Sequence, residues 1–264
     1  MQEQLWKNIL LVREKSPLVQ SITNYVVMNN TANALLAAGA SPIMAHAHQE
    51  MKDMVSIIGA LVINIGTLDE YWVKSMHVAI EQANLLNKPW VLDPVGAGAT
   101  LYRNEVLEEL LQTRPTIIRG NASEILALAS KHTSSTKGVD STHHSTEAIA
   151  AARTLNQHFG SVVCISGATD IVVNGDRMVK LTNGHPMMTR VTGMGCTATA
   201  LIGAFIAVRP TEAMEATISA MALLGVAGEV AAEKSKGPGS LQANILDTLF
   251  TLEENEFLKR VKIN

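Results

Sequence analysis

The feature that most constrains the fold of this chain is the regular alternation of short apolar segments with longer segments of helical period. Each short segment is almost entirely apolar or β-branched, as strands are when both faces of a parallel sheet are covered. The predicted strands are residues 18–22, 42–45, 61–65, 90–92, 116–119 and 162–166, and helices are predicted between them at residues 28–38, 69–87 and 105–113. This alternation predicts an α/β fold with a parallel sheet.

The pattern changes in the second half of the chain. Residues 171–173 and 177–181 are strand-like runs joined by Asn174-Gly175, which predicts an antiparallel hairpin. After Gly195 only helical stretches follow, to about residue 234, and then a Gly-Pro-Gly-Ser break at 237–240 and a final amphipathic helix. A TIM barrel would continue its βα units to the end, whereas an open sheet accepts a helical tail. We therefore expect a three-layer αβα sandwich with a doubly wound, mostly parallel sheet and an antiparallel edge hairpin.

Composition narrows the class of protein. The chain has 264 residues, 47% of them hydrophobic, which is enough for one large core, so a single domain spanning residues 1–264 is expected. A net charge of −3 with 4% aromatic residues argues against a nucleic-acid partner. The most apolar stretches, residues 197–208 and 213–232, are respectively too short for a bilayer and interrupted by Glu215 and Glu229. No membrane association is therefore expected.

The amino-terminal segment and the cysteines indicate a cellular setting. Residues 1–15 alternate charged and apolar residues at helical spacing, unlike a signal peptide. Cys164 and Cys196 are too few for a disulfide framework, so a reducing, cytoplasmic environment is expected. The polar segment 131–145 is predicted to be a surface loop.

Polar residues at strand ends are the first candidates for function, because ligands of open α/β sheets bind beyond the carboxyl ends of the strands. Asp93 closes one predicted strand and leads into small residues at 95–98, where a ligand can approach the backbone. A carboxylate in this place can hold hydrated magnesium. The competing interpretation is an Asx turn before Pro94.

Two further strand ends carry polar groups. Arg119 is a natural phosphate ligand, and Glu124, one helical turn further on, can hold a metal through water. Glu124 alone is also explained as a helix cap, since acidic residues favour helix starts. Ser166-Gly167 ends another strand and offers a hydroxyl and a backbone amide, although a turn alone explains this pair too.

The segment Thr192-Gly193-Met194-Gly195-Cys196-Thr197 is the most informative, because it directly precedes an apolar helix. Glycines that open a helix leave unpaired amides at its positive end, which favours an anion site. The spacing matches neither the dinucleotide fingerprint nor the phosphate loop. In the first helical turn the dipole is expected to lower the pKa of the Cys196 thiol, which would suit a base or a nucleophile. The alternative is that Cys196 is a small buried hydrophobe.

Residues near the second predicted strand indicate a substrate pocket. Met44 closes this strand on the ligand side and is expected to line an apolar pocket. His46 and His48 follow, and we expect them to serve a pocket or a loop, since the sequence offers no third metal ligand.

In their order and spacing these segments resemble the hydroxyethylthiazole kinase family of the ribokinase-like superfamily, from end to end. The resemblance is carried by SITNYVVMNNTANALLAAGASPIMAHA, LVINIGTL, VLDPVGAGAT, RGNASEILAL, CISGATD and VTGMGCTATA. It implies transfer of the ATP γ-phosphoryl group, with Mg²⁺, to the hydroxyl of 4-methyl-5-(2-hydroxyethyl)thiazole in thiamine salvage. It also implies a homotrimer with sites at subunit contacts.

The resemblance assigns roles residue by residue. Most ribokinase-like enzymes have an Asp as base where Cys196 stands, and thiazole kinases resemble this chain in having Cys. Phosphoryl transfer depends on positioning and charge neutralisation more than on early proton removal, so a weak base can suffice. The implied roles are an anion hole and reaction centre at Gly193, Gly195 and Cys196, magnesium at Asp93 and Glu124, ATP phosphates at Arg119 and Ser166, and thiazole at Met44, Gly193 and Asn24.

Three alternatives stay open. The nearest is a kinase of the same fold that acts on hydroxymethylpyrimidine or pyridoxal. A cysteine-nucleophile hydrolase is disfavoured, because hydrolase elbows place the nucleophile between glycines, whereas Thr197 and Ala198 follow Cys196. A non-catalytic thiazole sensor would bind the ligand without forming ADP.

Overall fold

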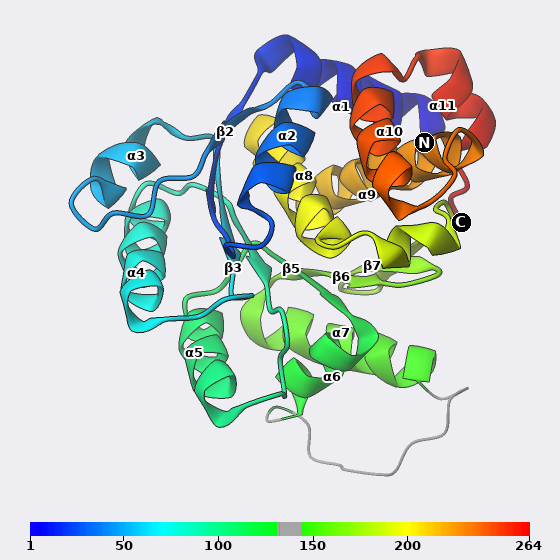
Figure 1. Ribbon diagram of the computed structural model, residues 1–264. Coiled ribbons are helices and arrows are strands. Elements are labelled where there is room, and N and C mark those ends of the chain that lie inside the picture. Colours follow the sequence, from blue (N-terminus) through cyan, green and yellow to red (C-terminus); the bar gives the residue numbers. More distant parts are fainter. Residues whose placement is uncertain (131, 133–143) are drawn as a thin grey trace.

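The computed structural model describes residues 1–130, 132 and 144–264, and one eight-stranded sheet lies at its centre (Figure 1). The strand order is β2-β1-β3-β4-β5-β6-β7-β8. Neighbouring strands are parallel from β2 to β6, whereas β7 is antiparallel to both β6 and β8. The strands are β1 (Leu18–Ile22), β2 (Ser41–Ile43), β3 (Ala60–Asn64), β4 (Trp90–Asp93), β5 (Ile117–Asn121), β6 (Val162–Ser166), β7 (Asp170–Asn174) and β8 (Arg177–Leu181).

Helices cover both faces of this sheet, which gives the three layers (Figure 1). A short 3-10 helix, η1 (Pro186–Arg190), connects the hairpin to the carboxy-terminal helices. One layer holds α1 (Gln2–Lys15), α2 (Met28–Ala38), α8 (Met194–Val208), α9 (Ala213–Glu233), α10 (Pro238–Thr251) and α11 (Glu254–Arg260). The other holds α3 (Met51–Ile57), α4 (Glu70–Leu85), α5 (Leu101–Gln112), α6 (Ala122–Ala129) and α7 (His144–Phe159).

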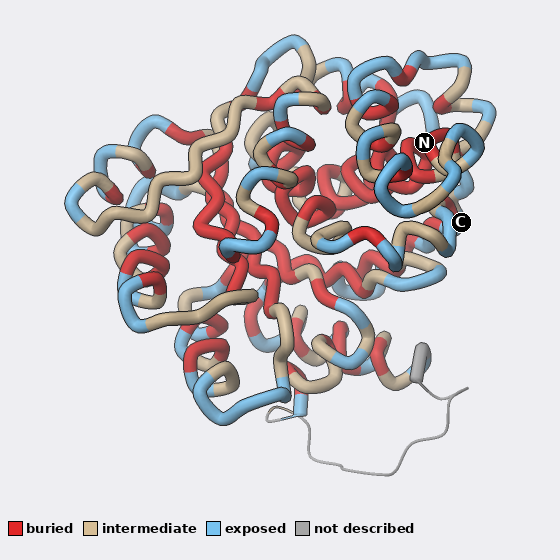
Figure 2. Tube along the Cα trace, in the orientation of Figure 1, coloured by how far each residue is buried: buried red, intermediate tan, exposed pale blue. Residues whose placement is uncertain are grey.

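The strands read as almost wholly apolar because successive side chains enter two different cores. In β3, Leu61 and Ile63 are buried with α3 to α7, while Val62 is buried with α8 and α9. Gly203 of α8 lets that helix lie against the sheet, since a Cβ there would come within 2.5 Å of Val62 Cγ2. Figure 2 shows the buried residues concentrated in the sheet and in the helices that pack on it.

The predicted sandwich with an antiparallel edge is confirmed, with changed boundaries. Strand β2 is shorter than the predicted 42–45, because it is an edge strand that pairs only with β1 and leaves the sheet after Ile43. Strand β5 runs beyond the predicted residue 119 to Asn121, since its pairing with β6 continues to Ser166. Helix α4 begins one residue after the predicted start, because Asp69 is its N-cap and accepts a hydrogen bond from Trp72 N. Helices α3 and α7 were not predicted.

The hairpin turn lies one residue later than predicted. Asn174 pairs with Arg177, so the two turn residues are Gly175 and Asp176. Gly175 has a φ of 59°, in the left-handed region that this kind of turn requires.

The carboxy-terminal and loop regions also differ from the expectation. The break at 237–240 is the start of α10, with Pro238 in its first turn, and a second helix, α11, follows it. The chain then returns to the sheet, where Ile263 bridges Leu181 antiparallel. Most of the predicted loop 131–145 lies outside the described residues, and α7 already begins at His144.

Helix α9 is the one helix of the described chain that is long and apolar enough to cross a membrane. However, 83% of its apolar window is buried inside the protein, as in a core helix. Its sequence is apolar on all sides because it packs against other helices and the sheet.

Candidate active site

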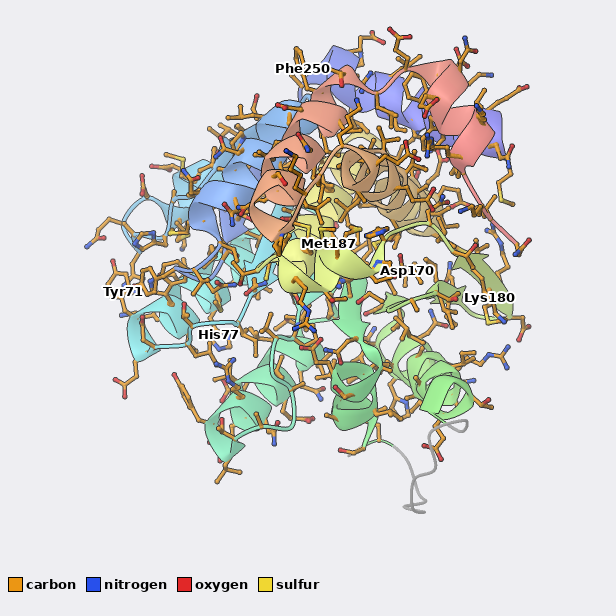
Figure 3. The ribbon with its side chains drawn as sticks, turned by 45° about the vertical axis from the view of Figure 1, so that its right-hand side comes forward. Tyr71, His77, Asp170, Lys180, Met187 and Phe250 are labelled. Atoms are coloured by element: carbon orange, nitrogen blue, oxygen red, sulfur yellow. The ribbon has the colours of Figure 1, made fainter. Side chains whose placement is uncertain are left out.

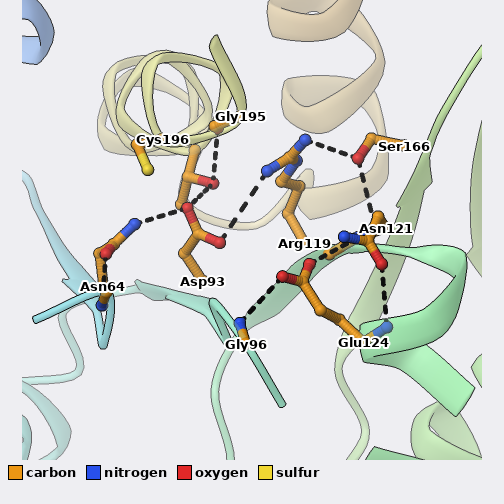
Figure 4. Close-up of polar contacts among 12 residues, drawn as sticks. Asn64, Asp93, Gly96, Arg119, Asn121, Glu124, Ser166, Gly195 and Cys196 are labelled. Atoms are coloured by element: carbon orange, nitrogen blue, oxygen red, sulfur yellow. Dashed lines mark hydrogen bonds and ion pairs between the residues drawn. The ribbon is translucent and has the colours of Figure 1, made fainter. Parts of the chain in front are cut away.

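Four elements meet at the carboxyl edge of the sheet: the ends of β4, β5 and β6 and the amino terminus of α8 (Figure 4). Gly193 is the N-cap of α8 and has a φ of 79°, which favours glycine. A Cβ at Gly193 would also lie 2.5 Å from Val27 Cγ1. The first turn of α8 therefore presents backbone amides without a side-chain cap, as predicted for an anion site.

Asp93 is the buried acid of this edge, with a relative exposure of 1%. Its Oδ2 accepts hydrogen bonds from Asn64 Nδ2 at 2.7 Å and from Thr199 Oγ1 at 2.9 Å. Its Oδ1 has no hydrogen-bond partner among the described atoms and lies 3.9 Å from Arg119 Nη1. Burial raises the pKa of Asp93 to about 6, with a smaller contribution from Glu124, while Arg119 opposes the rise. The interpretation as a simple Asx turn does not explain this arrangement.

Arg119 extends from β5 between Asp93 and Ser166 (Figure 4). Its Nη2 donates to Ser166 Oγ, and its Nε is buried without a partner in the described structure. A Cβ on Gly195 would overlap the guanidinium, so the second glycine of the helix start is needed for this close approach. The guanidinium is thus held beside the amino terminus of α8 with donor capacity left over.

Glu124 forms the helix cap that the sequence left as an alternative. Its Oε2 accepts from Asn121 N at 2.8 Å, and the Asn121 side chain accepts from Glu124 N, which is a capping box on α6. Its Oε1 accepts from Gly96 N at 3.0 Å and so holds the loop that follows Asp93. Glu124 is therefore both a cap and the link between that loop and α6.

Cys196 lies in the first turn of α8, next to the amide of Asn24. Asn24 Nδ2 donates to Cys196 Sγ at 3.5 Å and to Asn64 Oδ1 at 2.9 Å. The expected lowering of the Cys196 pKa was wrong. Burial and the charge of Asp93 raise the pKa to about 11, although the amides of Asn64 and Asn24 favour the thiolate. At neutral pH the group is therefore a thiol.

A cavity of about 740 Å³ opens from Arg119 and Ser166 toward the antiparallel edge. Its lining combines polar groups and the glycines of α8 with apolar side chains. Asp170 lines it at the start of β7, and Figure 3 shows Asp170 on that strand and Met187 on η1. The apolar side chains in this lining include Met188, Val191, Met221 and Leu224.

Met44 and the histidines lie at the other end of the strand order. Met44 follows β2, is partly buried and does not line this cavity. His46 stacks on Trp72 with ring centroids 4.8 Å apart, and His48 stacks on Tyr71. Neither histidine belongs to a metal-binding cluster within the described residues.

The sequence analysis missed three polar residues of this region: Asn64, Thr199 and Asp170. Asn64 was placed inside an apolar strand, although it is the only amide in that run and ends β3 beside Asp93. Thr199 was counted as part of an apolar helix, and only the packing of α8 on β4 brings it to Asp93. For Asn64 and Thr199 the available signal was a polar residue that interrupts an apolar segment.

The open αβα sheet with a glycine-opened helix at its carboxyl edge is the fold of ribokinase-like proteins. A ribokinase-like superfamily protein from Enterococcus faecalis V583 has this fold, with a TM-score of 0.66 at 14% identity over 91% of this chain and 87% of that one. The pyridoxal kinase of Staphylococcus aureus, solved with AMP-PCP and pyridoxal, shares the fold with a TM-score of 0.60 at 17% identity over 81% and 88% of the two chains.

The chain belongs to the hydroxyethylthiazole kinase family, whose model matches residues 9–255. The hydroxyethylthiazole kinase of Syntrophus aciditrophicus is 54% identical over 262 residues, covering 99% of this chain and 97% of the relative. That of Aliivibrio fischeri is 57% identical over 256 residues, covering 97% and 94%. The solved structure of the Pyrococcus horikoshii protein has a TM-score of 0.92 at 44% identity, covering 99% and 98%.

Proposed function

We propose that this protein transfers the γ-phosphoryl group of ATP to the hydroxyl of 4-methyl-5-(2-hydroxyethyl)thiazole, giving the thiazole phosphate and ADP, in thiamine salvage. The observation that carries the proposal is the family relationship, with curated thiazole kinases 54% to 57% identical over nearly the whole chain. The buried Asp and Arg beside the start of α8 supply a site suited to phosphoryl transfer.

The nucleotide is proposed to occupy the cavity between the helix start and the antiparallel edge. Arg119 and Ser166 line this cavity and would hold the phosphates. Among the described atoms the Arg119 Nε has no hydrogen-bond partner and can still donate. The amides of residues 193–195 would neutralise charge that develops on the transferring group. The apolar side chains of the lining suit a purine ring.

Asp93 and Glu124 are proposed to organise Mg²⁺, and the residues fit such an ion. Asp93 Oδ1 is buried, negatively charged when ionised and free of any hydrogen bond in the described structure, as an oxygen that faces a cation would be. Both Glu124 oxygens already accept backbone amides, so Glu124 is proposed to act through water. When bound, the metal supplies neutralisation of phosphate charge.

Cys196 is proposed to lie beside the substrate hydroxyl and to accept its proton during transfer. Its sulfur faces the Asn24 amide, which would turn the S–H away from this donor. Gly193, Gly195 and the Cys196 amide form the rest of the proposed reaction centre, and Gly193, Asn24 and Met44 are proposed to contact the thiazole. Because the thiol pKa is about 11, only the thiolate fraction of Cys196 can accept this proton, and that fraction is small at neutral pH.

The protein is further proposed to act in the cytoplasm as a homotrimer of one-domain subunits. Two apolar residues between β1 and α2, Tyr25 and Val26, are 58% and 63% exposed, which supports a subunit contact near Met44. All three residues of the edge strand β2 are only partly buried. Light scattering should give three times the chain mass of 28.3 kDa, and a monomer would contradict the trimer.

The substrate is tested by a direct comparison of three alcohols. Thiazole alcohol, hydroxymethylpyrimidine and pyridoxal are each incubated with ATP, and ADP and phosphorylated product are measured. We expect the highest kcat/KM for the thiazole alcohol, and a preference for either other alcohol would overturn this assignment. Binding of the thiazole alcohol without formation of ADP would indicate a non-catalytic sensor. Iodoacetamide labelling that is blocked by esters but not by ATP would indicate a hydrolase.

A further inference from the structure

Asn64 lies between the two groups to which chemistry is assigned, at the end of β3 and with a relative exposure of 2% (Figure 4). Its Nδ2 donates to Asp93 Oδ2 at 2.7 Å, and its Oδ1 accepts from Asn24 Nδ2 at 2.9 Å. Its Oδ1 also accepts from Gly66 N at 2.9 Å. Since a backbone N–H can only donate, this contact fixes which end of the Asn64 amide is oxygen.

The orientation of Asn64 determines how Asp93 is presented. With Thr199 Oγ1, Asn64 occupies Oδ2 of the carboxylate, so the unpaired oxygen among the described atoms is Oδ1. Oδ1 is also the oxygen nearer to Arg119. A rotation of the carboxylate would break two hydrogen bonds in a buried place, where lost bonds are costly.

The orientation of the Asn64 amide also affects Cys196, through Asn24. One hydrogen of the Asn24 amide is directed to Asn64 Oδ1 and the other can be directed to Cys196 Sγ, 3.5 Å away. Gly66 permits this arrangement, because a Cβ there would lie 2.6 Å from Asn24 Nδ2. The Cys196 sulfur, the amides of Asn24 and Asn64 and the Asp93 carboxylate thus form one chain of contacts. It runs from α8 through the segment after β1 to the ends of β3 and β4.

We propose that Asn64 is a positioning residue that holds Asp93 and, through Asn24, Cys196 in one fixed arrangement for phosphoryl transfer. This inference rests on the proposed roles of Asp93 and Cys196. Asn64 fixes the positions of both the Asp93 carboxylate and the Cys196 sulfur, so a change at Asn64 affects both. The charged groups that act on Cys196 are Asp93 from β4 and Arg119 from β5.

The test uses three variants and two measurements. Asn64→Ala removes the hydrogen bonds of Asn64 to both Asp93 and Asn24. Thr199→Val removes the second donor to Asp93, together with the contact of Thr199 Oγ1 with Gly195 O. Asn8→Ala is the matched control, since Asn8 is a buried Asn of α1 that is hydrogen-bonded to Ser219 Oγ of α9 at 2.9 Å and takes no part in this chain of contacts. The measurements are kcat and KM for both substrates, and the pH profile of iodoacetamide alkylation of metal-free protein. Alkylation reports Cys196, because the other cysteine of the chain, Cys164, is 0% exposed.

For Asn64→Ala we expect kcat to fall about 10- to 100-fold with little change in the KM for ATP, the scale of losing a residue that orients a ligand group. We also expect alkylation at pH 8.5 to slow by about tenfold, because a lost donor disfavours the thiolate. Thr199→Val should lower kcat without moving the alkylation profile. Asn8→Ala should change neither. Asn64→Ser, whose side chain is too short to bond both Asp93 and Asn24, repeats the test if the Ala variant does not fold.

Two outcomes would overturn the inference. One is a kcat for the Asn64 variants no lower than that of Asn8→Ala, and the other is an alkylation profile identical to that of the unchanged protein. A failure of the proposed function would look different, because the unchanged protein would then not phosphorylate the thiazole alcohol. The alkylation profile needs no substrate and is read in either case.

Discussion

The two sides of the candidate site are built in opposite ways. At the end of β4, Asp93 is held by buried polar contacts with Asn64 and Thr199, whereas Arg119 and Ser166, at the ends of β5 and β6, already face open space. On the antiparallel side, the hairpin, η1 and α9 surround a cavity of about 740 Å³. The difference suggests a division of labour, in which the side of Asp93 carries the chemistry and the cavity side, including Arg119, carries nucleotide binding. Substitutions on the two sides should therefore separate kcat from KM.

The largest effect is expected from Asp93→Asn. The Asn oxygen can still accept from Asn64 and Thr199, so the shape is kept while the charge is lost. We expect kcat to fall on the order of a thousandfold, the scale reported for one positioned charge at a transferring phosphoryl group, with little change in thiazole binding. Steady-state kinetics across a magnesium titration measure this.

Asp170→Asn is the matched control on the other side of the site. Burial raises the pKa of Asp170 to about 6, as it does for Asp93, and Asp170 accepts from Gly167 N at 3.0 Å, a bond that Asn can keep. We expect its kcat to stay within about threefold, because Asp170 lies on the cavity side, where a lost contact changes binding more than the chemical step. Equal losses of kcat in the two variants would abolish the proposed division of labour.

A smaller effect is expected from Arg119→Ala. One charge-assisted contact to phosphate contributes about 1.5 to 3 kcal/mol, so the KM for ATP should rise about 10- to 100-fold while the KM for thiazole changes little. Arg119→Lys should rescue only part, because an ammonium cannot reproduce a planar fork directed at two groups. Initial rates with each substrate varied in turn give both constants. Equal rises for the two substrates would mean that Arg119 supports the fold of this edge instead.

Glu124→Gln should have the smallest effect of the three. We expect kcat to fall about tenfold and the cap to weaken by about 1 kcal/mol, which lowers the Tm by about 2 to 4 °C. Asn121→Ala is the control, because it removes the other half of the same capping box without changing a charge. If the carboxylate helps to hold magnesium, the loss of kcat in Glu124→Gln should vary with magnesium concentration, whereas any loss in Asn121→Ala should not. The same behaviour in both variants would reduce Glu124 to a helix cap.

The two sides also differ in how far they could be predicted from the sequence. The parallel half and the positions of Asp93 and Arg119 followed from apolar runs that end in a polar residue, and Cys196 followed from glycines that open an apolar helix. The structure brings the three residues together. The hairpin turn was misplaced by one residue, because Asn174-Gly175 and Gly175-Asp176 are both favoured as two-residue turns. Only the pairing of Asn174 with Arg177 distinguishes them. The C-terminal bridge at Ile263 joins segments about 80 residues apart, and no local pattern encodes such a contact.

Local reasoning failed most clearly for the Cys196 pKa. A helix start favours the thiolate, and this effect is visible in the sequence. The opposing effects come from burial and from Asp93, on a strand about 100 residues away, so they depend on the packing of α8 against β4. The roles of Asn64 and Thr199 escaped for the same reason, since their partner lies on another element.

The proposal that chemistry belongs to the side of Asp93 is tested most directly by the pH dependence of kcat in the unchanged protein, Cys196→Asp and Cys196→Ala. With a thiol pKa of about 11, the thiolate fraction grows tenfold per pH unit below that value, so kcat should rise between pH 7 and 9. Cys196→Asp, already ionised, should have a flat profile and at least equal kcat at pH 7, while Cys196→Ala should be about 10- to 1,000-fold slower and flat. A flat profile in the unchanged protein together with full activity of Cys196→Ala would contradict the assignment of proton transfer to this side.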